Sequence, residues 1–313
     1  MQASLSTSSR QTLLFVLMCV IWGTTWIAIR AGITAVPPLF FAGTRFTVAG
    51  AILLILAGFS GNFARPSLRD WSRFGIASVL MITVCYGLLF WGMTLVNSGT
   101  AAVLEMSCTP LALIGFALAF REERFSWRSF GAIGVGVAGL SVLFGPAAWA
   151  GSSLATDQSS MHFLAGTAVV AAAISYGLGS VVARPLFKKF SPLVAAGVTT
   201  FVGGVLLLVG SIAWEPGAVG ALAGHWGFAA WFGWLFLVVF GSLVAFTIYM
   251  QLLKVWGSSR AGSYAFVSPV IAVILGAAVY REHVGVFDVV GMTIMLVAAY
   301  LAISGKSVLR DAG

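Results

Sequence analysis

Residues 101–122 read AAVLEMSCTPLALIGFALAFRE, a long apolar run with Glu105 near its start, Pro110 near its middle and an Arg-Glu pair at its end. Residues 261–282 read AGSYAFVSPVIAVILGAAVYRE and repeat this plan, with Pro269 in place of Pro110 and the same Arg-Glu ending. The prolines are 159 residues apart and the final glutamates 160, so one inserted residue aligns the two stretches. The chain therefore contains an internal duplication.

The composition is that of an integral membrane protein. Of 313 residues, 60% are hydrophobic and 8% are charged, with a mean hydropathy of +1.02, whereas soluble domains carry about 25% charged residues. Lipid is therefore the solvent for most of the chain. In this setting we interpret the net charge of +8 as topology signals and expect no nucleic-acid partner. The three cysteines lie in apolar stretches and no Cys/His pair has metal-ligand spacing, so we expect no disulfide framework, metal or cofactor.

Ten segments are long enough to cross a bilayer, which takes about 20 mostly apolar residues. They cover residues 12–30, 38–58, 73–96, 99–120, 127–145, 162–184, 192–214, 227–252, 260–280 and 285–304. Strands of a membrane barrel would alternate apolar and polar residues over about 10 positions, and these runs are too uniformly apolar for that. The sequence predicts an all-α polytopic membrane protein with ten transmembrane helices, and a linker at roughly 146–161.

The basic residues predict the orientation of these helices. With the amino terminus in the cytoplasm, 14 of the 17 Lys and Arg residues fall in segments on the inner side. The other three are Arg30 and Arg281 at outer helix ends, and Arg45 within a helix. Because positive residues concentrate on the cytoplasmic side, we expect both termini inside and the protein in the plasma (inner) membrane.

The duplication extends to the start of each half of the chain. The pairs that share an offset of 154 are Trp22-Gly23 with Tyr176-Gly177, Arg30 with Arg184, Pro38 with Pro192, Gly43 with Gly197, and Gly50 with Gly204. We therefore expect a five-helix repeat in residues 1–150 and a second in residues 151–313, forming one integral unit. Because five is odd, the second copy enters the membrane from the opposite side, as in the inverted repeats of many secondary transporters.

These features resemble the drug/metabolite transporter superfamily, EamA type. The resemblance is carried by the ten apolar helices in two inverted copies, the Thr109-Pro110 and Ser268-Pro269 steps, and the Arg-Glu endings. The opening at residues 21–26, IWGTTW, is similar to the usual start of the family. The overall pattern most resembles the YddG-type exporters of aromatic amino acids. The resemblance implies a central cavity lined by the first, third, fourth, sixth, eighth and ninth helices, with the fifth and tenth standing apart.

Arg45 and Glu105 are the two charges expected deep within the membrane. Arg45 lies seven residues after Pro38 and Glu105 six after Gly99. At 1.5 Å per residue, both lie roughly 10 Å below the outer surface. Charges inside a membrane are costly, and they usually pair or face water. Three interpretations stay open: an ion pair or snorkelling contact that only holds helices together, contacts with a zwitterionic substrate, or proton carriage by Glu105. The repeat places Tyr264 at the position that corresponds to Glu105.

Aromatic side chains recur at repeat-related positions, where Trp22 corresponds to Tyr176 and Phe90 to Tyr249. A chamber of aromatic rings with a few hydroxyls would suit a flat organic solute. Aromatic residues at helical spacing are also ordinary packing or interfacial residues. The predicted substrate-binding residues are Trp22, Trp26, Arg45, Thr83, Tyr86, Phe90, Glu105, Tyr176, Ser242, Phe246, Tyr249 and Tyr264.

Pro110 and Pro269 remove helical hydrogen bonds within the membrane and can form fixed kinks or hinges. Their repeat-related placement favours hinges that open opposite sides. We interpret the Arg-Glu pairs at 121–122 and 281–282 as surface capping and topology residues, with gate latches as the alternative.

The sequence as a whole predicts a secondary carrier that exports small organic metabolites by alternating access, with amino acids, including aromatic ones, as the expected substrates. The alternatives are a carrier for other metabolites or drugs, a channel, and a membrane-embedded lipid-modifying enzyme. No catalytic His/Asp/Ser constellation and no Walker motif occurs in the sequence, so we do not expect an enzyme. The expected partners are the solute and the lipid bilayer, and the sequence leaves the oligomeric state open.

Overall fold

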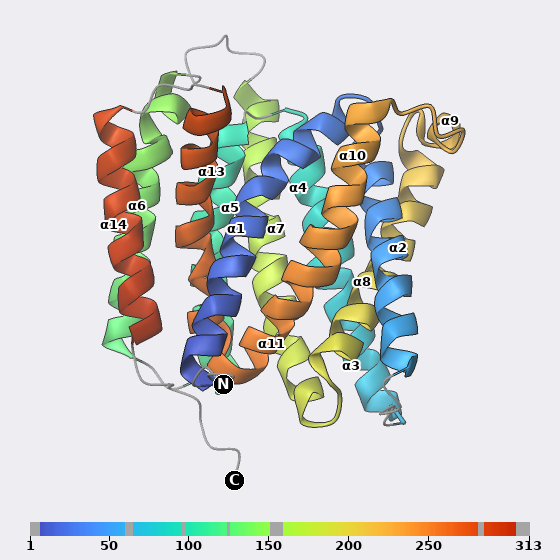
Figure 1. Cartoon of the computed structure of the whole chain (residues 1–313), viewed down its shortest axis with the longest axis horizontal. Coiled ribbons are helices and arrows are strands. Elements are labelled where there is room, and N and C mark those ends of the chain that lie inside the picture. The colour runs from blue at the N-terminus through green and yellow to red at the C-terminus, as the bar shows by residue number, and fades with distance from the viewer. Residues whose placement is uncertain are drawn as a thin grey trace, which may run out of the picture.

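The computed structural model describes residues 7–59, 65–95, 98–123, 126–150, 159–280 and 285–304, and the elements formed in these ranges are helices (Figure 1). They are α1 (Thr7–Ile33), α2 (Pro38–Phe59), α3 (Leu68–Ser78), η1 (Val79–Val84), α4 (Cys85–Met93), α5 (Ser98–Ala119), α6 (Trp127–Ala150), α7 (Ser159–Ala183), η2 (Arg184–Lys188), α8 (Pro192–Trp214), α9 (Ala218–Ala221), α10 (Phe228–Phe236), η3 (Leu237–Ala245), α11 (Phe246–Trp256), α12 (Ser258–Gly262), α13 (Tyr264–Tyr280) and α14 (Val286–Ser304).

Within the described ranges, six helical stretches are long and apolar enough to cross a membrane: Ser9–Ile33, Pro38–Phe59, Leu68–Met93, Phe163–Lys188, Pro192–Trp214 and Phe228–Trp256. Shorter apolar helices cover Leu104–Ala119, Phe130–Val142 and Val289–Leu301. Large apolar side chains such as Phe59 and Phe228 stand on the outer surface, each 86% exposed, as is usual where lipid is the solvent. The described part of the chain is helical and consistent with the predicted polytopic membrane protein, whereas the ten crossings and the inverted repeats stay predictions.

Several helices differ from the limits expected from hydropathy. The third expected span, 73–96, begins earlier, at Leu68, because Ser67 and Asp70 form a reciprocal cap at that end. The expected linker at 146–161 is helical up to Ala150 and again from Ser159. The ninth expected span, 260–280, is divided into α12 and α13. Hydropathy marks where side chains meet lipid, whereas a helix continues until its backbone is capped, so the two limits differ.

Helices α2 and α8 pack closely because glycines let their backbones meet. A Cβ atom on Gly50 would lie 2.2 Å from the backbone nitrogen of Phe201. Similar approaches occur at Gly43 with Leu208, at Gly204 with Thr47 and at Gly197 with Leu54. As the residue number rises along α2, that of its neighbour on α8 falls by the same amount, so the two helices run antiparallel.

The carboxylate of Glu215, just after α8, fixes the start of α2. It accepts hydrogen bonds from the backbone nitrogens of Leu39 at 2.9 Å and Phe40 at 2.8 Å. These N–H groups have no partner within their own helix. The Ser211 hydroxyl donates to the same carboxylate at 2.5 Å, so the end of α8 caps the beginning of its antiparallel neighbour.

The remaining helices pack across the middle of the molecule. Helix α1 packs against α13 and α10, and α7 packs against α5 and α4. Helices α6 and α14 pair at one end of the bundle, while α2 and α8 lie toward the other (Figure 1). We call the face at which α1 begins, at the bottom of Figure 1, the N-terminal face.

Two π-helical segments occupy the middle of the third and eighth expected spans. η1 joins α3 to α4, and η3 joins α10 to α11. Carbonyls of both segments accept hydrogen bonds from helices that begin the two halves. Ser175 of α7 donates to Leu80 at 2.8 Å, and Trp22 of α1 donates through Nε1 to Gly241 at 3.4 Å. Such segments widen a helix and are frequent at functional sites.

Candidate functional site

Four aromatic side chains from four helices meet in the interior. The ring centroid of Trp22 (α1) lies 4.5 Å from that of Tyr264 (α13) and 5.5 Å from that of Tyr249 (α11). Tyr176 (α7) lies 5.5 Å from Tyr249, whose hydroxyl shares a 2.9 Å hydrogen bond with Ser180. The rings are tilted or edge-on to one another, an arrangement that aromatic pairs favour. The aromatic cluster, Trp22, Tyr176, Tyr249 and Tyr264, thus brings both expected halves together.

A second group surrounds Arg45 of α2. The guanidinium carbon lies 4.4 Å from the ring centroid of Phe46 and 5.9 Å from that of Tyr86. Nε donates a 3.0 Å hydrogen bond to the hydroxyl of Ser242 in η3. Tyr86 in turn contacts Phe46 and Phe90, with centroid distances of 4.5 and 5.9 Å. Three chain segments that are distant in sequence therefore meet at one buried cation.

Glu105 of α5 is the second charge of this interior region. It interacts electrostatically with Cys85, Tyr86 and Tyr264, and it is partly exposed. No ion pair joins Glu105 to Arg45, both of which the structure describes. The ion pair that was one expectation for these charges is therefore not formed, and Tyr86 interacts electrostatically with both of them.

The other predicted binding residues divide into two sets. Phe246 joins the aromatic cluster, with its centroid 6.2 Å from that of Tyr249. The Thr83 hydroxyl instead donates to the carbonyl of Gly203 at 2.9 Å, so it points toward α8. Trp26 packs against the hydrophobic core and makes no ring contact with the other described aromatic residues. The predicted roles in substrate binding stay predictions.

Three residues near the site were not selected from the sequence: Phe46, Cys85 and Ser180. Each is adjacent to a predicted residue or one helical turn from it, since Ser180 follows Tyr176 by four positions. Helical spacing was therefore the signal that would have found Ser180. Phe46 and Cys85 had no such signal, because neighbours in sequence point to different sides of a helix.

The two prolines lie inside α5 and α13, where both are buried. A glycine of the opposite half approaches the helix close to each proline. A Cβ on Gly177 would lie 2.7 Å from Cβ of Ala112, and one on Gly23 would lie 2.8 Å from the carbonyl oxygen of Ser268. Each proline-containing helix therefore touches the first helix of the other half.

We expect Pro110→Ala and Pro269→Ala to insert normally but to lose most of their transport activity. Alanine restores the missing backbone donor and straightens the helix, which would hold the chamber in one conformation. Initial uptake rates in proteoliposomes, normalised to protein that is folded by gel filtration, measure the effect. Unchanged turnover in both variants would leave the prolines as fixed kinks.

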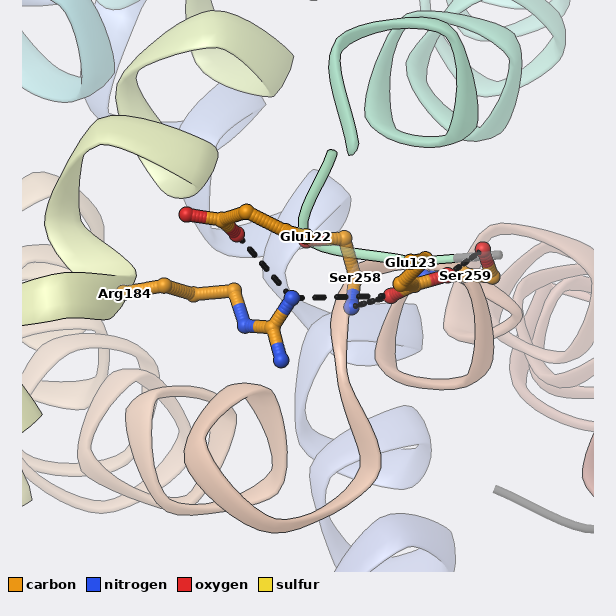
Figure 2. A network of polar contacts seen from close by, with 5 residues as sticks. All are labelled: Glu122, Glu123, Arg184, Ser258 and Ser259. Carbon is orange, nitrogen blue, oxygen red and sulfur yellow. Dashed lines mark hydrogen bonds and ion pairs between the residues drawn. The ribbon is translucent and has the colours of Figure 1, made fainter. Parts of the chain in front are cut away.

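A polar network ties three segments together (Figure 2). It includes the residues that follow α11, which ends at the N-terminal face (Figure 1). Arg184, which follows α7, forms ion pairs with Glu122 at 3.0 Å and Glu123 at 3.9 Å. Glu123 also accepts hydrogen bonds from the backbone nitrogens of Ser258 at 2.6 Å and Ser259 at 3.3 Å, and from the Ser259 hydroxyl. We call these five residues the polar latch. It joins the α5–α6 connection of the first half to the ends of α7 and α11 in the second.

The latch is largely shielded from water, since the side chains of Arg184, Glu122 and Glu123 are 13%, 18% and 7% exposed. Burial raises the pKa of Glu122, while Arg184 and Arg73 lower it and Glu123 raises it further. The pair expected at 121–122 therefore contributes Glu122 to a contact between halves, whereas Arg121 is exposed. The corresponding pair at 281–282 lies outside the described residues. Glu123, Ser258 and Ser259 had no recognisable motif in the sequence.

Proteins similar to this chain are transporters. The sequence profile of the EamA-like transporter family matches residues 10–145 and 164–304. The uncharacterized inner membrane transporter YedA of Escherichia coli strain K12 is 30% identical over 291 residues, which cover 92% of this chain and 88% of YedA. The uncharacterized transporter YoaV of Bacillus subtilis is 24% identical and covers 90% of this chain and 92% of its own length. A solved protein structure superposes with a TM-score of 0.75 at 20% identity over 94% of this chain and 96% of that one, which shows a shared fold.

Proposed function

The chain belongs to the EamA-like transporter family, and on this premise we propose that it is a secondary carrier that exports small organic solutes by alternating access. The observation that carries the proposal is the buried site between the expected halves. There Glu105 interacts with Tyr264 of the aromatic cluster, and Tyr86 interacts with both Arg45 and Glu105. Amino acids, including aromatic ones as in the YddG-type exporters, combine both charges with an apolar side chain and suit this arrangement.

The proposed carrier has ten crossings in two inverted five-helix repeats, residues 1–150 and 151–313. Four observations support this organisation. The family profile matches the chain in two separate stretches. Helices α2 and α8, the second of each half, make reciprocal antiparallel contacts at glycines. The π-helical segments η1 and η3 lie at repeat-related positions. Finally, α1 packs on α13 as α7 packs on α5.

In the proposed cycle the N-terminal face is cytoplasmic and the polar latch closes it. The basic residues of this face support the orientation, since they include Arg184 and Lys189. Exchange between two conformations of similar energy then requires the latch to form and break once per cycle. Closure by ion pairs and hydrogen bonds, rather than by continuous apolar packing, is compatible with repeated opening.

Reconstitution in liposomes tests the carrier function. Purified protein with an unlabelled amino acid inside the vesicles should drive saturable counterflow of the same radiolabelled amino acid, because a carrier exchanges solute on both sides. A panel that includes phenylalanine, leucine and glutamate, with and without a proton gradient, would define the substrate class. Ion currents without counterflow would instead identify a channel, and modification of added lipid without flux would identify an enzyme.

We also propose that Glu105 carries a proton during transport. Glu105→Gln cannot exchange a proton, so we expect its counterflow to lose stimulation by a proton gradient and to depend little on pH. Glu105→Asp keeps the ionisable group and should retain part of the response. A wild-type rate and pH profile in Glu105→Gln would remove the proton role and leave the carrier function intact.

A further inference from the structure

Among the residues that the structure describes, Arg45 is a buried cation without an anionic partner. It is 3% exposed, and no described carboxylate forms an ion pair with it. A guanidinium has five N–H donors. Nε uses one of them for Ser242, at 3.0 Å. Within the described residues the other four, on Nη1 and Nη2, form no hydrogen bond. Such an arrangement is costly inside a membrane unless something else satisfies the charge.

Helix packing does not explain the positive charge of Arg45, because the other half of the chain packs with an uncharged residue at the corresponding position. The offset of 154 places Thr199 of α8 at the position of Arg45, and the hydroxyl of Thr199 donates to carbonyls of its own helix at 2.6 and 3.2 Å. The offset of 159 places Thr83 at the position of Ser242, and Thr83 donates to the Gly203 carbonyl at 2.9 Å. The repeat-related position is therefore neutral and internally satisfied.

The free end of the guanidinium adjoins the aromatic cluster. A Cβ on Gly241 would lie only 3.1 Å from Nη2 of Arg45. Because glycine has no side chain, there is room for Nη2 at this position. The carbonyl of the same Gly241 accepts the Nε1 hydrogen bond of Trp22. Phe46 covers one face of the guanidinium, which leaves the edge formed by Nη1 and Nη2 as the part able to bind an anion.

We propose that Arg45 binds the carboxylate of the transported solute end-on, through Nη1 and Nη2. This inference rests on the proposed carrier function and narrows its substrate class to organic acids and amino acids that carry a free carboxylate. Ser242 holds the guanidinium in orientation through Nε, and the planar fork of arginine matches a carboxylate with two parallel hydrogen bonds. Arg45 is then a specificity-determining residue, and the aromatic cluster contacts the rest of the solute.

Binding to the purified full-length protein in detergent tests the assignment without requiring transport. Each amino acid of the panel is compared with its carboxamide, which has nearly the same shape but no negative charge. We expect the wild type to bind at least one acid about tenfold or more tightly than its amide, because hydrogen bonds to a charged partner are strong. Quenching of tryptophan fluorescence reports binding, since Trp22 lies in the site.

In Arg45→Gln this preference should disappear, whereas Arg45→Lys, which keeps the charge but not the fork, should retain part of it. Arg65→Gln removes an exposed arginine and should bind as the wild type does. Thermal unfolding of each variant separates loss of binding from loss of fold. Equal affinity for acid and amide in the wild type, an unchanged preference in folded Arg45→Gln, or binding of no carboxylate in the panel would overturn the inference. Acid-selective binding without counterflow would support Arg45 as a carboxylate site and refute the carrier function.

Discussion

Gly50→Ala is expected to lower the midpoint of thermal unfolding by roughly 5–10 °C in detergent. Its Cβ would lie 2.2 Å from the backbone nitrogen of Phe201, and a backbone atom cannot move aside as a flexible side chain can. The two helices would have to separate along their closest contact. Overpacking of this kind costs about 2.5 kcal/mol, toward the upper end of the usual range, and each kcal/mol shifts the midpoint by roughly 2–4 °C in a protein of 150–250 residues.

Gly58→Ala is the matched control, because it lies in the same helix and nothing lies within 4 Å of its Cβ position. This change should leave the midpoint unchanged or raise it, since alanine favours a helix by about 1 kcal/mol over glycine. Gly204→Ala should reproduce the loss seen at Gly50, because Gly204 makes the reciprocal contact with Thr47. Equal midpoints for Gly50→Ala and Gly58→Ala would contradict the close contact between α2 and α8.

The fold class was predictable because lipid imposes a simple rule on sequence. Every backbone polar group in the membrane must be satisfied within its own segment, so long apolar runs imply helices. The offset of 154 also pointed to Gly43, Gly50, Gly197 and Gly204, which all lie at the contact between α2 and α8. The ends of helices were less predictable, as the cap formed by Ser67 and Asp70 shows.

The interior site was predictable in part. Helical spacing and repeat offsets selected most of the aromatic cluster, and they identified the two buried charges. They did not determine which neighbouring helix each side chain faces. A helix that is apolar on all sides has no polar stripe in its sequence to show how it is rotated about its axis. Thr83 therefore points toward α8, and Arg45 bonds to Ser242 rather than to Glu105. The sequence singled out Glu122 and Arg184 of the polar latch, but it carried no signal for Glu123, Ser258 and Ser259 or for the contact among the three segments.

Loss of the latch is expected to open the N-terminal face, and Glu123→Ala removes its central acceptor. The backbone nitrogens of Ser258 and Ser259 would lose their shared partner, and Arg184 would lose one of its two carboxylates. Breaking a buried ion pair costs about 3–5 kcal/mol, and about 2.7 kcal/mol already changes the ratio of two conformations by roughly a hundredfold. The open conformation should therefore accumulate, and counterflow should fall because closure is a required step.

Cys85 can report this opening. Its side chain lies beside Tyr86, and the residue is only 3% exposed in the structure, in which the latch is formed. With Cys19 and Cys108 replaced by alanine, a small thiol reagent supplied from the N-terminal side should modify Cys85 up to a hundredfold faster in Glu123→Ala. Lys189→Gln is the control on the same face. It breaks the Lys189–Asp70 pair, in which the lysine side chain is 41% exposed, and exposed pairs contribute about 0–1 kcal/mol. Similar modification rates in Glu123→Ala and the wild type would show that other contacts, and not the latch, keep this face closed.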